Sequence, residues 1–242
     1  MIERHVNTLA DFCALRDVPE LTRDAVEEVA GGRVDVAILF GGSTLAGGDV
    51  FAQAIADEVA DRYMIVGGQG HSTDVLRAAV GWPDAEGMTE AAIFDRYLGE
   101  RHGVRTDLLE QESTNCGNNV TLALARLAEH HVPVRRILII QDATMQRRMD
   151  AGFRLHAPRS RIVNFASHRT HVPVARPPLG MWAPERYLEM LMGEIPRFTG
   201  YGPEGRGFIA HVDVPAAVTE AWAALRDLGV GEARVADQRW AG

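Results

Sequence analysis

The sequence of 242 residues predicts an α/β protein in which helices cover both faces of a parallel β-sheet. The first observation is a series of short apolar runs without strict alternation, which is typical of strands buried on both faces. The second is that segments with helical periodicity separate these runs along the chain. The third is that the runs end in polar or glycine-rich loops, as expected at the carboxyl edge of such a sheet.

Two helices are expected first, over residues 8–16 and 20–30, with a break at Pro19 and an end at Gly31. The apolar runs then predict strands at residues 34–40, 63–66, 135–140 and 161–165. Helical patterns lie between and around them at residues 49–61, 89–102, 115–131 and 144–156. This alternation favours a doubly wound sheet over any all-α or all-β arrangement.

The chain changes in texture from about Pro173, where prolines become frequent. A helix is expected over residues 184–192, a strand over 207–214 and a last helix over 215–228. The sequence therefore predicts a ligand-binding domain of residues 1–172, with N-terminal helices within 5–30, and an appended C-terminal α+β segment of residues 173–242. This segment either wraps the sheet or caps its carboxyl edge, and Trp182, Tyr187 and Tyr201 are core residues of it or a surface for a partner.

All 25 basic residues are arginine, so the chain has no lysine. GC-rich coding explains this composition better than any function does. The absence excludes a Schiff-base lysine, a pyridoxal-phosphate anchor and a complete Walker A loop, all of which need a lysine ammonium group.

The remaining bulk properties predict a cytoplasmic protein with a small-molecule ligand. A net charge of −8 argues against nucleic acid as a partner. No stretch approaches the roughly 18 consecutive apolar residues of a membrane span, and the first residues lack the apolar core of a signal peptide. Cys13 and Cys116 form neither a disulfide framework nor a metal cluster by spacing, and no metal is expected. The oligomeric state is left open.

Four loops are expected to meet at the carboxyl edge of the sheet and to form a ligand site there. They span residues 41–44, 67–73, 112–119 and 141–148. The candidate ligand-binding residues in them are Gly41, Gly42, Ser43, Gly68, Gly70, His71, Ser72, Thr73, Glu112, Ser113, Thr114, Asn115, Asn119, Gln141, Asp142, Thr144, Arg147 and Arg148. Because arginine does not transfer protons near neutral pH, His71, Glu112 and Asp142 are the candidates for acid–base chemistry.

Each loop also has a structural interpretation. Residues 67–73 suit an anion at a helix N-terminus, although Ser72 or Thr73 can equally cap that helix. Asn115 is a ligand-binding amide or only an N-cap, and Cys116 is a weak candidate nucleophile or a half-buried small residue. The two arginines at 147 and 148 are solvated charges, or one of them faces a bound anion or an acidic neighbour such as Asp142.

Known catalytic signatures are absent from these loops. The sequence GGSTLAGG at residues 41–48 is not a dinucleotide-binding G-x-G-x-x-G motif, and no acidic residue closes a second strand. There is also no G-x-S-x-G elbow and no H-E-x-x-H helix.

The chain resembles the YdcF-like family, within the superfamily that includes SanA and ElyC, from about residue 30 to residue 230. The matching stretches are GGQGHST at 67–73, STNCG at 113–117, QDATMQRR at 141–148, WAPERYL at 182–188 and YGPEGRGFIAHVDV at 201–214. Two positions depart from the superfamily pattern. Asn118 stands where a glutamate is usual, and Thr144 stands where many relatives have histidine, which weakens the case for acid–base chemistry at both.

The resemblance implies a Rossmann-like three-layer α/β/α domain that binds S-adenosylmethionine, with no settled reaction. It places the cofactor among the loops that hold His71, residues 113–119 and residues 142–148. The first hypothesis is therefore an S-adenosylmethionine-binding protein, methyltransferase-like or not. The alternatives are an enzyme acting on a phosphorylated or nucleotide-sugar substrate in envelope metabolism, and a non-catalytic ligand sensor.

Overall fold

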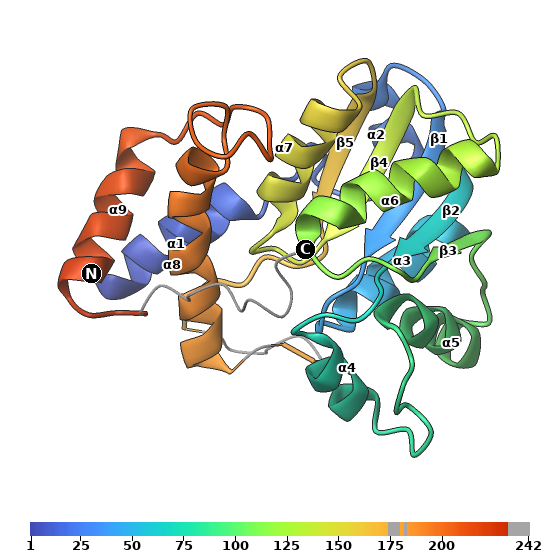
Figure 1. Cartoon of the computed structure of the whole chain (residues 1–242), viewed down its shortest axis with the longest axis horizontal. Coiled ribbons are helices and arrows are strands. Elements are labelled where there is room, and N and C mark those ends of the chain that lie inside the picture. Colours follow the sequence, from blue (N-terminus) through green and yellow to red (C-terminus); the bar gives the residue numbers. More distant parts are fainter. Residues whose placement is uncertain (174–179, 182, 232–242) are drawn as a thin grey trace.

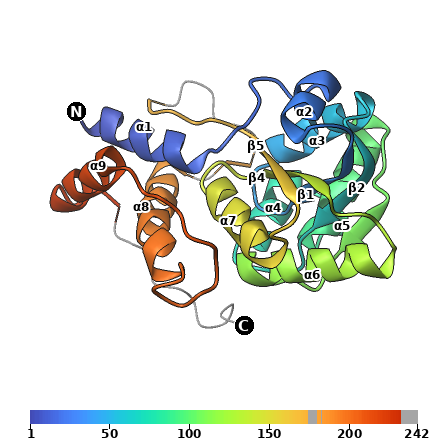
Figure 2. The ribbon, with the colours of Figure 1, turned by 90° about the horizontal axis from the view of Figure 1, so that it is seen from above.

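The computed structural model describes residues 1–173, 180–181 and 183–231. It contains a five-stranded, all-parallel sheet in the order β3-β2-β1-β4-β5 (Figures 1 and 2). The strands are β1 (Val34–Phe40), β2 (Ala60–Val66), β3 (Leu108–Glu110), β4 (Arg136–Gln141) and β5 (Arg161–Ala166). The predicted α/β fold with a parallel sheet between helical layers is thus confirmed.

Strand β1 lies at the centre of the sheet, and all seven of its residues are buried. Leu39 pairs with Ile65 of β2 on one side and with Ile140 of β4 on the other. The chain winds outward from β1 to β3 and then returns to place β4 on the opposite side of β1. The carboxyl ends of β1 and β4 therefore flank the topological switch point, where α/β proteins commonly bind ligands.

Alternate residues of the strands point into two separate cores, one on each face of the sheet. The first core contains Ala37 and Leu39 of β1 and is covered by α2 (Arg23–Ala30), α3 (Ala46–Ala56) and α5 (Glu90–His102). The second contains Val36 and Ile38 and is covered by α6 (Cys116–Glu129) and α7 (Gln146–His156). Helix α4 (Thr73–Val80) lies beside α5 (Figure 1). The near-continuous apolar runs are explained by burial on both faces.

A third core joins the first helix to the C-terminal segment. Helix α1 (Ile2–Cys13) packs on α8 (Pro184–Gly200) and α9 (Ala216–Asp227), on one side of the sheet domain (Figures 1 and 2). Leu9 of α1, Phe198 of α8 and Leu225 of α9 belong to this core. The structure thus associates α1 with the segment after residue 173, although the chain between them forms the sheet.

Two expected elements of the chain differ from the structure. Residues 207–214 form no strand; Val212 is buried and Val214 half-buried in the third core, while His211 and Asp213 are exposed, so the alternation is present without a strand. The described part of the C-terminal segment is therefore helical and irregular, not α+β. The first helix of this segment, expected to end at Met192, continues through Pro196 to Gly200 as α8. Short strand β3 was not expected, because only three residues form it.

Smaller differences concern the ends of elements. Helix α1 begins at Ile2 and ends at Cys13, and α3 ends at Ala56, before β2 begins at Ala60. No described helix is both long and apolar enough to cross a membrane.

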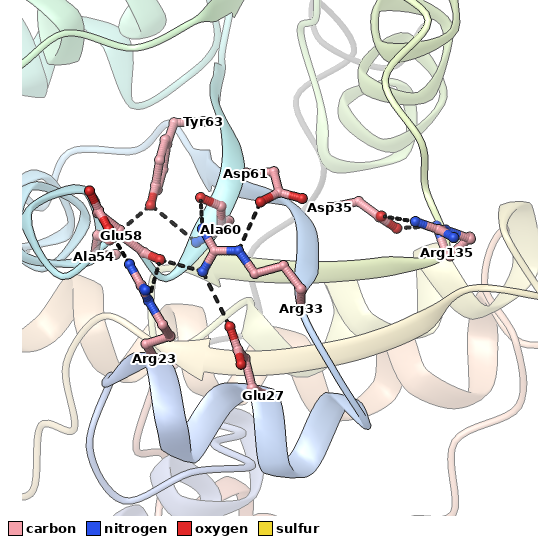
Figure 3. Close-up of polar contacts among 10 residues, drawn as sticks. All are labelled: Arg23, Glu27, Arg33, Asp35, Ala54, Glu58, Ala60, Asp61, Tyr63 and Arg135. Atoms are coloured by element: carbon pink, nitrogen blue, oxygen red, sulfur yellow. Dashed lines mark hydrogen bonds and ion pairs between the residues drawn. The ribbon is translucent and has the colours of Figure 1, made fainter.

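Arginines order the amino-terminal edge of the sheet, opposite the loops of interest (Figure 3). Arg33 donates hydrogen bonds to the Asp61 carboxylate at 2.8 Å, the Glu27 carboxylate at 3.3 Å and the Ala60 carbonyl at 2.8 Å. The Asp35 carboxylate accepts the backbone N–H groups of Arg135 and Arg136 at 2.8 Å each. The polar groups of this edge are hydrogen-bonded to one another, so we expect a ligand site at the opposite, carboxyl edge of the sheet.

Candidate functional site

The loops after β1 and β4 form a buried polar cluster at the switch point. The Asp142 carboxylate accepts hydrogen bonds from the Thr144 N–H at 2.8 Å, the Thr144 hydroxyl at 2.6 Å and the Thr44 hydroxyl at 3.2 Å. It also lies 3.3 Å from Nε2 of His168, which follows β5. All four residues are buried, and His168 is one that the sequence reasoning did not select.

The Asp142 carboxyl is ionised at neutral pH. Burial raises its pKa, but this effect is outweighed by the hydrogen bond and the charge of His168 and by the two hydrogen bonds from Thr144. Together they lower the pKa of Asp142 to about 2. His168 is held in turn by Thr170, whose hydroxyl lies 2.8 Å from Nδ1. The Tyr187 hydroxyl of α8 donates to the Thr170 carbonyl at 2.6 Å. The cluster therefore links the carboxyl edge of the sheet to α8, and the polar groups of the cluster are hydrogen-bonded within the protein.

Ser43 and Gly180 show how tightly the chain covers this cluster. Ser43 is 1% exposed, and its hydroxyl has no hydrogen-bond partner among the described residues. A Cβ atom added to Gly180 would lie 2.1 Å from the Ser43 carbonyl oxygen, so the backbone at residue 180 rests against the loop after β1. The predicted residues Gly41, Gly42 and Ser43 thus lie at the switch point but face protein.

The loop of residues 67–73 holds a carboxylate of the protein itself. The hydroxyls of Ser72 and Thr73 donate to Oε1 of Glu90 at 2.7 and 3.0 Å. A Cβ at Gly41 would lie 2.5 Å from the Glu90 carboxylate, so only glycine fits there. Burial raises the pKa of Glu90, against the two hydroxyl hydrogen bonds. Ser72 and Thr73 therefore bind Glu90, the first residue of α5, and a ligand anion at this loop stays a prediction.

The loop of residues 112–119 is built around backbone hydrogen bonds. The Glu110 carboxylate accepts the N–H groups of Glu112 at 2.6 Å and Ser113 at 2.9 Å. The Ser113 hydroxyl accepts the N–H of Gly68 at 3.2 Å, and a Cβ on Gly68 would lie 2.2 Å from the Ser113 carbonyl. These contacts fix the two loops side by side. The Glu112 side chain, a predicted acid–base candidate, is exposed.

Asn115 and Asn118 form a capping box at the start of α6. The Asn115 side-chain oxygen accepts the N–H of Asn118 at 3.1 Å, and the Asn118 oxygen accepts the N–H of Asn115 at 2.9 Å. Asn115 is thus an N-cap residue, as the structural interpretation had it, and it also lines the cavity described below. Asn118, which departs from the superfamily pattern, does the work that a glutamate does in the usual capping box.

A cavity of about 560 Å³ lies next to these loops, between α6, α7, α8 and the loop after α8. It has the size of a small-molecule site. Four predicted residues line it: His71, Thr114, Asn115 and Arg148. Apolar side chains form much of the wall, namely Val120, Met145, Met190, Phe208 and Ile209. The remaining predicted residues lie outside it: Gly41, Gly42, Ser43, Gly68, Gly70, Ser72, Thr73, Glu112, Ser113, Asn119, Gln141, Asp142, Thr144 and Arg147.

A buried ion-pair triad forms the α7–α8 side of the cavity. Arg148 donates two hydrogen bonds to the carboxylate of Glu194, Nε to Oε2 at 2.6 Å and Nη2 to Oε1 at 2.9 Å. Arg197 donates to the same carboxylate at 2.9 Å, and Glu194 is fully buried. Arg206 lies on the exposed rim of the cavity with Phe208. Glu194 and Arg197 were missed because the sequence suggested that their helix ends at residue 192.

The two neighbouring arginines of α7 serve different purposes. Whereas Arg148 faces the cavity, Arg147 donates a hydrogen bond to the Phe12 carbonyl of α1 and stacks on the Phe12 ring, with Cζ 4.2 Å from the ring centroid. Arg147 therefore fastens α1 to α7.

The two cysteines also differ in environment. Cys116, the first residue of α6, lines the cavity with its sulfur 3.5 Å from that of Met145. Cys13 is fully buried, and burial raises the pKa of its thiol well above the usual range.

The fold and site define a class: an α/β protein with a parallel sheet and a metabolite-sized cavity beside its carboxyl edge. No family model matches the sequence. Across the described residues there is no group of three or more His, Cys, Asp or Glu side chains able to hold a metal ion.

Proposed function

We propose that the protein binds a small metabolite in the cavity between α6, α7 and α8, and that S-adenosylmethionine is the first candidate. The observation that supports this is the mixed lining of the 560 Å³ cavity, which combines apolar side chains with amide, hydroxyl and guanidinium groups. Binding sites for nucleoside-containing metabolites combine such surfaces. The resemblance to the YdcF-like family supplies the identity of the candidate.

The lining residues suit the three parts of S-adenosylmethionine. Its carboxylate would pair with an arginine, as guanidinium groups bind carboxylates in a bidentate manner. The adenine would contact the amides at the start of α6 and the thioethers of Met145 and Met190. The sulfonium would lie against the rings of Tyr201 and Phe208, because the cavity carboxylate of Glu194 is already bound by two arginines. Bound S-adenosylmethionine supplies an electrophilic methyl group, and we assign no acceptor.

Isothermal titration calorimetry tests this proposal directly. We expect saturable heat with S-adenosylmethionine, and weaker heat after Met190→Arg, which would fill the apolar part of the cavity. S-adenosylhomocysteine, which lacks the sulfonium charge, shows whether that charge contributes to the affinity. Heat no different from buffer at high micromolar ligand would rule out this ligand.

A second candidate function is action on a phosphorylated or nucleotide-sugar substrate. The observation that favours it is the charge of the cavity, where Arg148, Arg197 and Arg206 outnumber the one glutamate, Glu194. Such a lining favours ligands with net negative charge over S-adenosylmethionine, whose net charge is positive. A screen of nucleotide sugars and sugar phosphates in the same calorimeter distinguishes the two candidates.

A further inference from the structure

The arginines at the α8 end of the cavity are arranged around one carboxylate. Glu194 is fully buried and accepts three hydrogen bonds, two from Arg148 and one from Arg197. Its single charge neutralises only one of these two guanidinium groups. Both arginines are themselves largely buried, with side-chain exposures of 13% and 18%. A buried cation without a counter-ion is costly, so this triad favours an additional negative charge close by.

Arg206 adds a further positive charge at the mouth of the same cavity. It is exposed, and no described carboxylate forms an ion pair with it. Its Cζ lies 5.9 Å from the ring centroids of both Tyr201 and Phe208, so the loop after α8 holds it between two aromatic side chains. With the histidines neutral, three arginines and one glutamate give the cavity an excess of two positive charges.

The start of α6 faces the same space. Cys116 and Gly117, the first two residues of this 14-residue helix, line the cavity. The positive end of the helix dipole therefore adds to the field of the arginines. Guanidinium groups and a helix N-terminus together are the usual recognition elements for phosphate and carboxylate groups.

From these observations we propose that Arg148, Arg197 and Arg206, with Glu194 as a positioning residue, form a subsite for an oxyanion group of the ligand. The subsite rests on the proposed function, because it requires that a metabolite binds in this cavity. A phosphate monoester carries close to two negative charges at pH 7 and matches the excess charge, whereas a carboxylate carries one. The charge of the cavity thus ranks a phosphate ligand above a carboxylate.

The test compares two exposed arginines, one at the cavity and one away from it. Arg206→Met removes the rim charge. Arg226→Met is the control for loss of an exposed arginine beside an aromatic ring, since Arg226 of α9 lies 5.1 Å from the Trp222 ring, pairs with Asp227 at 2.8 Å and does not line the cavity. The probes are inorganic phosphate, pyrophosphate and L-methionine, added to the full chain and followed by calorimetry and by the shift in Tm. Because both arginines are exposed, both variants should fold.

We expect phosphate and pyrophosphate to bind to the wild type, and Arg206→Met to weaken their affinity about ten-fold while Arg226→Met leaves it unchanged. Binding of L-methionine but of neither phosphate would retain the subsite and assign it to a carboxylate. Absence of binding by all three probes, or equal affinity in the Arg206 variant and the wild type, would overturn the proposal.

The two proposals fail independently. If S-adenosylmethionine gives no heat while phosphate binds in an Arg206-dependent manner, the cofactor proposal is wrong and the subsite stands. If S-adenosylmethionine binds while phosphate, pyrophosphate and L-methionine show no Arg206-dependent binding, the cofactor proposal stands and the subsite is wrong.

Discussion

Asp142 is the residue on which the switch-point cluster depends. Its carboxylate is buried, ionised and surrounded by donors from Thr44, Thr144 and His168. The same contacts that lower its pKa stabilise the fold, because a carboxyl that binds its proton less tightly when folded adds to stability once it is ionised.

Asp142 should make the stability acid-sensitive. Its pKa falls from 3.8 to about 2 on folding, so its contribution is complete above the first value and is lost as the pH falls toward the second. Asp142→Asn should lower the free energy of unfolding at pH 7 by roughly 2 kcal/mol and reduce its decline between these pH values. Urea titrations over this range measure both effects. An unchanged pH dependence in the variant would contradict the assignment.

Glu90 should act in the opposite direction. Burial raises its pKa, so the folded state favours the protonated form, and stability is lost as the pH rises through the folded value. Glu90→Gln keeps an oxygen acceptor for Ser72 and Thr73 but carries no charge. We expect the variant to gain stability relative to the wild type as the pH rises from 4.5 toward neutrality. The exposed Glu86→Gln is the control, and equal pH profiles of the three proteins would contradict this.

At the level of single elements, α6 begins with a capping box, in which the side chains of Asn115 and Asn118 each accept the backbone N–H of the other residue. Because this N-terminus lines the cavity, its order and the shape of the site are coupled. From the sequence, Asn118 stands where the superfamily usually has a glutamate, which weakened the case for acid–base chemistry at this position. The structure gives it a capping role, which an asparagine or a glutamate can perform.

Substitutions at Asn118 separate these roles. Asn118→Ala removes the acceptor for the N–H groups of Thr114 and Asn115 and should cost about 1 kcal/mol of stability. Asn118→Glu restores the usual capping-box residue and should retain stability to within about 0.5 kcal/mol. Thermal or urea unfolding measures both. A glutamate variant as unstable as the alanine variant would show that the box does not tolerate the longer side chain.

How much could be predicted differed from element to element. Strands β1 and β4 were identified because burial on both faces leaves an uninterrupted apolar run. Glu194 and Arg197 were missed because the predicted helix ended at residue 192, whereas α8 continues to Gly200 with Pro196 inside it. The convergence of the four loops was predicted, but not that Glu90, His168 and Gly180 fill the space between them, since these contacts link distant segments.

On the scale of the whole molecule, the cavity lies where two packed bodies meet. Helices α6 and α7 belong to the sheet domain, and α8 belongs to the core that it shares with α1 and α9. The Arg148–Glu194 ion pair and the Tyr187–Thr170 hydrogen bond cross between them. The shape of the cavity therefore depends on how α1, α8 and α9 hold together.

Loosening that helical core should disturb the cavity without unfolding the sheet. Leu9 of α1 is fully buried against α8 and α9, and Leu9→Ala should cost about 2–5 kcal/mol. Relative to the wild type, we expect Leu9→Ala to speed hydrogen exchange in α1, α8 and α9 but not in β1 and β4. We also expect the variant to bind S-adenosylmethionine more weakly. Val75→Ala, at a residue 42% exposed on α4, is the control. Uniformly faster exchange through both bodies would show that the molecule unfolds as one unit.

The packing of α1 also has a consequence for synthesis. A helix made among the first residues finds its partners, α8 and α9, only after the intervening sheet has been translated. Until then the apolar face of α1, with Val6, Leu9 and Phe12, is not covered by these two helices. The sheet can mature on the ribosome once β5 has emerged, but the cavity, whose far wall is α8, is completed only after Gly200 has emerged as well.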